Sequence, residues 1–322
     1  MKIFCLFVCL LILSSCASTP QSRQILVEPP SSLPIAVELA DTPFYPQLEY
    51  QCGPAALATV LEFKGVKTSL EELSREIYIP ARKGSLQIEM KAAARRHGML
   101  PYELAPQLLD LLSEIAAGNP VLVLQNLSFE WYPQWHYAVV IGYDISKHEV
   151  ILRSGTTRRW VTPFKVFERT WQRADFWALS MVPVGKIPKT AKPQSYLKTV
   201  FAFEETGHSE FALTAYRSAT QQWPDVLDTW LTLGNMAFQN QRWQEAINAF
   251  SVATRLEPAS LVSWNNFSYA LHDAGCASQA QQAIQCGLKI APADENLQHS
   301  LDDLKSRPAG SEQMECLKIE CY

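Results

Sequence analysis

The chain has no strong excess of charge and no long apolar run after its first residues. Charged residues make up 19% of the 322 residues, and the formal net charge is −4. No basic run or arginine-rich helix is present, so the composition gives no support for a nucleic-acid partner. The hydrophobic content of 48% is sufficient for packed cores, and the length favours about two domains.

The first sixteen residues have the pattern of a targeting segment. Lys2 supplies the positive charge, and residues 3–13 form an apolar run too short to span a bilayer stably. The segment ends in Leu13-Ser-Ser-Cys16, which resembles the lipobox of bacterial lipoproteins. The resemblance implies cleavage before Cys16 and diacylation of its thiol; the alternative is an ordinary secretory signal. Ala17 is not the Asp that retains lipoproteins at the inner membrane, which implies the periplasmic face of the outer membrane.

Composition divides the rest of the chain into segments. We expect a signal peptide at 1–16, a flexible extended tether at 17–39, an α+β domain at 40–187, helical repeats at 195–305 and a tail at 306–322. The prolines of the tether favour an extended chain.

Within residues 40–187, helical patterns precede strand patterns. Helices are expected from Pro54, from the capping box Ser69-Leu-Glu-Glu72, over Leu86–His97 and from Pro106 to Gly118. Strands are expected at Val121–Leu124, His136–Tyr143, Glu149–Arg153, Trp160–Val161 and Phe176–Val182, with residues 144–148 closing a hairpin. This order is typical of an α+β domain with an antiparallel sheet.

Cys52 precedes Gly53-Pro54 and an apolar run at helical spacing, so it is predicted to lie at a helix N-terminus. The helix macrodipole favours an anion there, and such a thiol tends to have a lowered pKa. This position favours a nucleophile; the alternative is a small buried cysteine in a turn.

Three elements of the sequence carry a family resemblance: Gln47, Cys52-Gly-Pro-Ala-Ala56 and His136-Tyr-Ala-Val-Val-Ile-Gly142. They resemble the bacteriocin-processing peptidases, family thirty-nine of the cysteine peptidases. The resemblance covers residues 40–187, under half of the chain. It implies a papain-like fold and cleavage of leader peptides after a double glycine.

The chemistry of a cysteine peptidase assigns roles to these residues. Cys52 would be the nucleophile, His136 the base, and Gln47 with the Cys52 backbone N–H the oxyanion donors. Gln47 stands five residues before the cysteine, where the family usually shows six, and Gln51 is the alternative donor. The alternatives to these roles are a histidine hydrogen-bonded within the sheet and a solvated loop amide.

The third catalytic residue is where the sequence departs from the family, which places an Asp or Asn about sixteen residues beyond the histidine. Asp144 would lie about 26 Å from His136 along a strand, so it is predicted to be a turn residue. Folding the hairpin returns Ser154 to the side of His136. A hydroxyl can accept the imidazole N–H but supplies no charge, so we expect a weaker base or a substitute carboxylate elsewhere.

Two groups of side chains near His136 have alternative interpretations. The aromatic residues Trp131, Tyr132 and Trp135 either line a substrate cleft or pack at the sheet edge. The arginines Arg153, Arg158 and Arg159 are expected on a solvated face rather than as contacts for an acidic substrate.

A period of 34 residues begins near residue 195. It relates Pro224, Pro258 and Pro292; Ala212, Ala246 and Ala280; Tyr216, Phe250 and Ile284; and Tyr196, Trp230 and Trp264. This is the tetratricopeptide pattern, in which each helical hairpin buries its face only against its neighbours. Three such repeats form a groove for a peptide or protein partner; the alternative is a rigid spacer or a dimer surface.

Four further cysteines remain, an even number that suits an oxidising compartment. Cys276 and Cys286 would lie about 15 Å apart on one helix, so we expect pairing with or within the tail that carries Cys316 and Cys321. No His or carboxylate completes a ligand set with them, and we expect no metal and no cofactor.

Together these features predict a periplasm-facing outer-membrane lipoprotein with a papain-like cysteine peptidase domain and three tetratricopeptide repeats. Its partners would be a peptide or protein substrate, a protein on the repeat groove and the membrane. Two alternatives are a catalytically silent peptide-binding adaptor, favoured by the missing carboxylate, and a Cys-His acyl-transfer enzyme or amidase.

Overall fold

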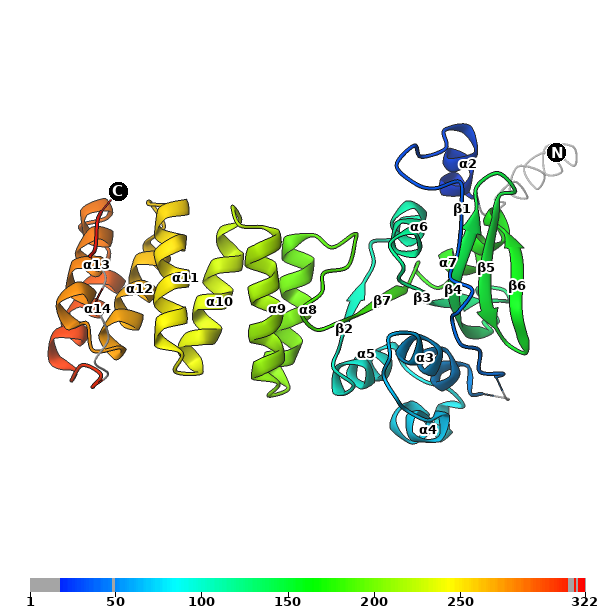
Figure 1. Cartoon of the computed structure of the whole chain (residues 1–322), viewed down its shortest axis with the longest axis horizontal. Helices are drawn as coiled ribbons and strands as arrows, with labels where there is room; N and C mark the ends of the chain where they lie inside the picture. Colours follow the sequence, from blue (N-terminus) through cyan, green and yellow to red (C-terminus); the bar gives the residue numbers. More distant parts are fainter. Residues whose placement is uncertain (1–17, 48–49, 312–315, 317, 322) are drawn as a thin grey trace, which may run out of the picture. The chain divides into compact units, whose positions relative to one another are not determined.

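The computed structural model describes residues 18–47, 50–311, 316 and 318–321. The predicted signal peptide and Cys16 lie outside these residues. The chain divides into two compact units (Figure 1). The first unit contains the chain up to Pro183 and the short segment Pro188–Ala191. The second unit contains Val184–Ile187 and the chain from Lys192 onward. In the described part of the chain, we find no helix with the length and apolar character needed to span a bilayer.

The first unit is built on a seven-stranded antiparallel sheet of order β2-β7-β3-β4-β5-β6, with β1 paired to β4. The strands are β1 Ala36–Glu38, β2 Met99–Glu103, β3 Val121–Asn126, β4 Trp135–Asp144, β5 Glu149–Ser154, β6 Thr157–Pro163 and β7 Ala178–Pro183. Every residue of β4 from Tyr137 to Tyr143 is buried, so both faces of the sheet are covered. The predicted β4–β5 hairpin is confirmed, whereas β2 was not anticipated.

Helices cover the sheet on both sides. They are α2 Pro20–Val27, α3 Cys52–Phe63, α4 Leu70–Ile77, α5 Gln87–Arg96, α6 Leu108–Ala116 and α7 Phe164–Gln172, with a short 3₁₀ turn at Pro80–Arg82. Figure 1 shows α3, α4 and α5 together, and their apolar side chains share one core with Leu122, Tyr137 and Val139. Gln125 lies on the opposite face from its neighbour Leu124 and donates to Thr170 of α7, so α7 covers the other face.

The α+β prediction is therefore confirmed, and the local signals explain its helices. The Ser69–Glu72 capping box forms at the start of α4. Residues Gly53 to Leu61 of α3 are all buried, which explains why this helix is apolar on every side. Gly98 and Gly118 follow α5 and α6 with positive φ of 71° and 82°, a backbone conformation that glycine adopts freely.

The predicted extended tether at residues 17–39 differs from the structure. Residues 20–27 form α2, and β1 pairs with the far end of β4. The carboxylate of the fully buried Glu168 accepts hydrogen bonds from the backbone N–H groups of Gln21 and Ser22, the latter at 2.7 Å. These N–H groups belong to the first turn of α2 and have no acceptor within the helix itself, so Glu168 attaches α2 to α7 through the helix N-terminus.

The second unit is a row of helical hairpins. Its helices are α8 Pro193–Glu205, α9 Ser209–Gln222, α10 Leu227–Gln239, α11 Trp243–Leu256, α12 Leu261–Asp273, α13 Ala277–Ile290 and α14 Glu295–Ser306. The three repeat-related alanines, Ala212, Ala246 and Ala280, are fully buried. Trp230 and Trp264 each donate their indole N–H to the proline carbonyl six residues earlier, at 2.7 and 2.8 Å. The tetratricopeptide prediction is confirmed, and α14 extends the array by one helix.

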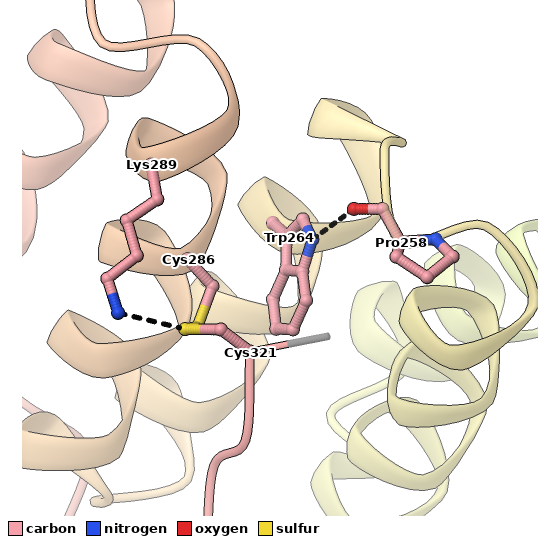
Figure 2. Close-up of a disulfide and its surroundings, with 5 residues drawn as sticks. All are labelled: Pro258, Trp264, Cys286, Lys289 and Cys321. Carbon is pink, nitrogen blue, oxygen red and sulfur yellow. Dashed lines mark hydrogen bonds between the residues drawn. A yellow bond between two sulfur atoms is a disulfide. The ribbon is translucent and has the colours of Figure 1, made fainter.

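The C-terminal tail is attached to α13 by two disulfides. Cys276 pairs with Cys316 and Cys286 with Cys321, with Cα–Cα distances of 5.6 and 5.3 Å. Figure 2 shows the second of these, with Lys289 donating to the Cys321 sulfur. Pairing with the tail, one of the two predicted arrangements, is therefore confirmed.

Candidate active site

Cys52 is the first residue of α3, two positions before the predicted helix start at Pro54. Burial raises the pKa of its thiol, and the backbone N–H groups of Tyr137, Gly53 and Cys52 itself act in the opposite direction. The expectation of a lowered pKa is therefore wrong, because desolvation of the thiolate outweighs the helix-terminal donors. Cys52 is the free cysteine among those that the structure describes, and it is only partly buried.

His136 lies near the start of β4, as predicted, and is hydrogen-bonded to Ser154. Its Nε2 lies 2.9 Å from Ser154 Oγ at the end of β5, so the β4–β5 hairpin returns Ser154 to the place expected for a third catalytic residue. Burial lowers the pKa of His136, and a serine supplies no negative charge to counter it. The imidazole is therefore neutral at neutral pH.

Gln47 is held between the two strands that carry His136 and Ser154. Its side-chain amide donates to the Tyr137 carbonyl at 3.2 Å and accepts from the Gly155 N–H at 3.1 Å. Its backbone N–H donates to the Gly155 carbonyl. These bonds exclude the alternative of a solvated loop amide. Within the part of the chain that the structure describes, the Gln47 side-chain nitrogen donates one hydrogen bond, which leaves its second hydrogen for another acceptor.

The four predicted site residues lie at the open end of the β4–β5 hairpin. His136 and Ser154 belong to its two strands, and Cys52 and Gln47 contact the residues that follow them, Tyr137 and Gly155. Cys52 and Gln47 both contact the backbone of Tyr137, through its N–H and its carbonyl. The structure thus brings a thiol, an imidazole, a hydroxyl and an amide to the start of one hairpin.

Two residues of the site were missed by the sequence analysis. Tyr137 supplies backbone groups to Cys52 and Gln47, and its hydroxyl donates to the Ser85 carbonyl. Gly53 has no room for a side chain, since a Cβ would lie 2.5 Å from Ser85 Oγ. The glycine after the cysteine was the available signal for this close approach.

Two further predictions concern residues of the β4–β5 hairpin. Asp144 is the last residue of β4, directly before the turn at residues 145–148, rather than a residue of the turn itself. Hydrogen bonds from Ser146 Oγ and from the Lys147 side chain lower the pKa of its carboxyl to about 2, and the Lys147 N–H also donates to it. Arg153 is not on a solvated face. It is buried and donates to the carbonyls of Ala40 and Thr42, and thereby fixes the segment that leads to Gln47.

Residues 39–179 match the model of the Peptidase_C39 like family. The match covers the N-terminal α+β unit and confirms the resemblance to this class of cysteine peptidases for that part of the chain. The chain is thus an α+β domain like the C39 peptidases joined to a tetratricopeptide-type helical domain. No curated protein matches it.

Solved structures resemble each part separately. A putative C39-like peptidase from Bacillus anthracis is 20% identical, covers 48% of this chain and 99% of its own, and has a TM-score of 0.40. A double glycine motif protease from an AMS/PCAT transporter, in complex with the leader peptide, is 22% identical over 47% of this chain and 99% of its own, with a TM-score of 0.36. The first TPR of Spaghetti (RPAP3), bound to an HSP90 peptide, is 12% identical over 36% of this chain and 91% of its own, with a TM-score of 0.33.

Proposed function

We propose that this protein is a cysteine peptidase of the bacterial cell envelope that hydrolyses peptide bonds through Cys52 and His136. The observation that carries the proposal is the convergence of Cys52, Gln47, His136 and Ser154 on the start of one hairpin. The match to the Peptidase_C39 like family supports the same chemistry. The repeat domain would bind a protein partner, and a lipid on Cys16 would hold the protein on the periplasmic face of the outer membrane.

In the proposed reaction, the Cys52 sulfur attacks the peptide carbonyl while its proton passes to His136. Because Nε2 is bonded to Ser154, the proton acceptor is Nδ1. The oxyanion accepts hydrogen bonds from the Cys52 N–H and the second amide hydrogen of Gln47. The C–N bond breaks as His136 returns the proton to the leaving amine, and water then hydrolyses the thioester.

The electrostatics favour a neutral resting pair. Burial raises the pKa of Cys52 and lowers that of His136, so the thiol and the imidazole are both uncharged at neutral pH. Proton transfer would accompany attack rather than precede it. A catalytically silent peptide-binding adaptor is the second candidate, because Ser154 stands where a carboxylate would stabilise the imidazolium.

The first test is the pH dependence of Cys52 alkylation by iodoacetamide, followed by mass spectrometry. The disulfides protect the four C-terminal cysteines, and Cys16→Ser removes the predicted lipidation site. We expect an apparent pKa above the usual value of about 8.5 and slower alkylation at neutral pH in His136→Ala. His148→Ala, in the far turn of the hairpin, is the matched control and should leave the rate unchanged.

Peptide hydrolysis decides between the two candidates. Mass spectrometry of peptide mixtures with the parent protein and Cys52→Ala should show cleavage products with the parent alone. If the rate of Cys52 alkylation did not change in His136→Ala and no peptide were cleaved, the peptide-binding adaptor would be the function. Transfer of an acyl group to an added amine without hydrolysis would identify an acyl-transfer enzyme instead.

A further inference from the structure

The segment between β3 and β4, together with Trp135 at the start of β4, exposes five large apolar side chains. We call residues 127–135 the aromatic loop. Its exposed side chains are Leu127 at 44%, Phe129 at 61%, Trp131 at 82%, Tyr132 at 70% and Trp135 at 55%. The rings of Phe129 and Trp131 stack with their centroids 5.6 Å apart. Packing at the sheet edge, one of the two interpretations of Trp131, Tyr132 and Trp135, would bury them, so this much exposed apolar surface indicates a partner.

The aromatic loop has a fixed shape. The side-chain oxygen of the buried Asn126 accepts hydrogen bonds from the N–H groups of Ser128 and Gln134, at 3.0 and 2.9 Å. Its amide nitrogen donates to the Phe129 carbonyl, and the Leu127 N–H donates to the Gln134 carbonyl. The aromatic rings are therefore presented to solvent by an ordered turn.

A row of cations leads along α7 to the base of this loop. Lys165, Arg169 and Arg173 stand four residues apart, which places them on one side of the helix and its C-cap. We call these three residues the cationic stripe. Lys165 and Arg169 are exposed, and Arg173 donates to the backbone carbonyl of Asn126. Glu168, the carboxylate within α7, is buried beneath α2, so it does not neutralise the stripe at the surface. Glu130, exposed between Phe129 and Trp131, is the one carboxylate of the aromatic loop.

The same helix receives the N-terminal segment. The backbone N–H groups of Gln21 and Ser22 bind Glu168, the neighbour of Arg169. Pro20, at the start of α2, is four positions after Cys16, a reach of at most about 14 Å. A lipid on Cys16 would therefore keep the bilayer surface close to α7.

We propose that the aromatic loop and the cationic stripe bind an anionic phospholipid bilayer. Trp131, Tyr132 and Phe129 enter the headgroup interface, which is the preferred location of amphipathic aromatic rings. The stripe faces lipid phosphates, where each cation strengthens binding roughly fivefold. The Phe129 and Trp131 rings stack on one another, and the Trp131 and Tyr132 rings are tilted by 46°. Exposed rings that contact one another favour a broad lipid surface over a single peptide side chain.

Vesicle co-sedimentation tests this surface without the lipid anchor. The chain from residue 16 onward, carrying Cys16→Ser, retains every described element. We expect it to bind vesicles of phosphatidylethanolamine and phosphatidylglycerol more tightly than vesicles of phosphatidylcholine. Trp131→Ser with Tyr132→Ser should lower the partition coefficient at least tenfold. Lys165→Gln with Arg169→Gln should lower it about as much on the anionic vesicles alone.

Matched substitutions control for lost aromatic surface and lost charge. Trp160→Ser removes a 51% exposed Trp from the edge strand β6, and Lys67→Gln removes an exposed charge from the α3–α4 loop; both should bind as the parent does. Cys52→Ser should also bind normally, so failure of the proposed peptidase reaction would not affect this test. Absence of vesicle binding by the parent protein would overturn the proposal. The proposal would also fail if the Trp131→Ser, Tyr132→Ser variant bound vesicles as the parent does but had a raised KM for a soluble peptide.

Discussion

At the residue scale, the chemistry of the candidate site depends on what lies beside the imidazole of His136. Ser154 fixes the position of Nε2 but adds no charge, and burial disfavours the protonated ring. Cys52 is similarly biased toward its neutral form. Both shifts disfavour the charged thiolate–imidazolium form of the pair, and the proposed peptidase reaction would be sensitive to the charge of the group beside Nε2.

A carboxylate at position 154 should change this balance. In Ser154→Asp, the new charge beside Nε2 favours the imidazolium, which in turn favours the thiolate. We expect the apparent pKa of Cys52 alkylation to fall by about 1 unit or more. The pH profile measured with iodoacetamide checks this. Ser31→Asp adds the same charge in an exposed loop and should leave the profile unchanged, whereas an equal shift in both variants would contradict a local effect.

Loss of the Ser154 hydroxyl should act on turnover rather than on binding. Ser154→Ala leaves Nε2 without its partner, so the ring is free to adopt an unproductive orientation. We expect kcat to fall with KM nearly unchanged, and Ser154→Thr, which keeps a hydroxyl, to restore part of the rate. Steady-state kinetics on a cleaved peptide makes the measurement. A selective rise in KM would show that Ser154 contacts substrate instead.

At the element scale, the turn within each helical hairpin requires a left-handed residue. Gly207, Gln241 and Gly275 occupy equivalent positions 34 residues apart, with φ of 76°, 57° and 89°. Two of the three are glycines, which adopt this conformation without steric cost. Gln241 adopts it with a side chain, so the middle repeat carries local backbone strain.

Replacement of Gln241 by Gly should therefore stabilise the repeat domain. Relief of the left-handed strain outweighs the greater chain entropy of glycine, and we expect a gain of up to about 1 kcal/mol. Gly275→Ala introduces the same strain in the next repeat and should cost about 1–2 kcal/mol. Urea unfolding followed by circular dichroism provides both values. A destabilised Gln241→Gly would show that this side chain stabilises the turn more than its backbone strains it.

At the scale of the whole molecule, the two units have different sources of stability. The first has a sheet covered on both faces, with α2 docked onto α7. The second is a row of hairpins whose C-terminal end carries two covalent bonds between α13 and the tail. These disulfides close loops of 40 and 35 residues, long enough to restrict the unfolded chain appreciably.

Reduction should accordingly affect one unit and spare the other. Loss of a disulfide of this kind typically costs about 2–4 kcal/mol, which lowers a melting midpoint by roughly 10 °C. Calorimetry with and without dithiothreitol should show the repeat-domain transition moving down while the sheet-domain transition stays in place. Cys286→Ser should reproduce part of the shift without reductant. An equal shift in both transitions would show that the units unfold as one.

The sequence by itself determined the features that depend on local pattern. The 34-residue period predicted the helical hairpins, because each repeat buries the same positions against its neighbours. The length of the hairpin folded about residues 144–148 predicted that Ser154 would return to the side of His136. These inferences depend only on the number of residues per helical turn and on the rise per residue of a strand, which are the same in every protein.

Tertiary structure decided what depends on burial and on distant partners. Only the folded chain shows that desolvation outweighs the helix terminus at Cys52, since the amount of water removed depends on the whole core. The proline-rich segment forms α2 because Glu168, 146 residues from Ser22, accepts its first-turn N–H groups. Arg153 is buried because the carbonyls of Ala40 and Thr42 converge on it. Each outcome depends on residues far apart in sequence, and no local pattern encodes their approach.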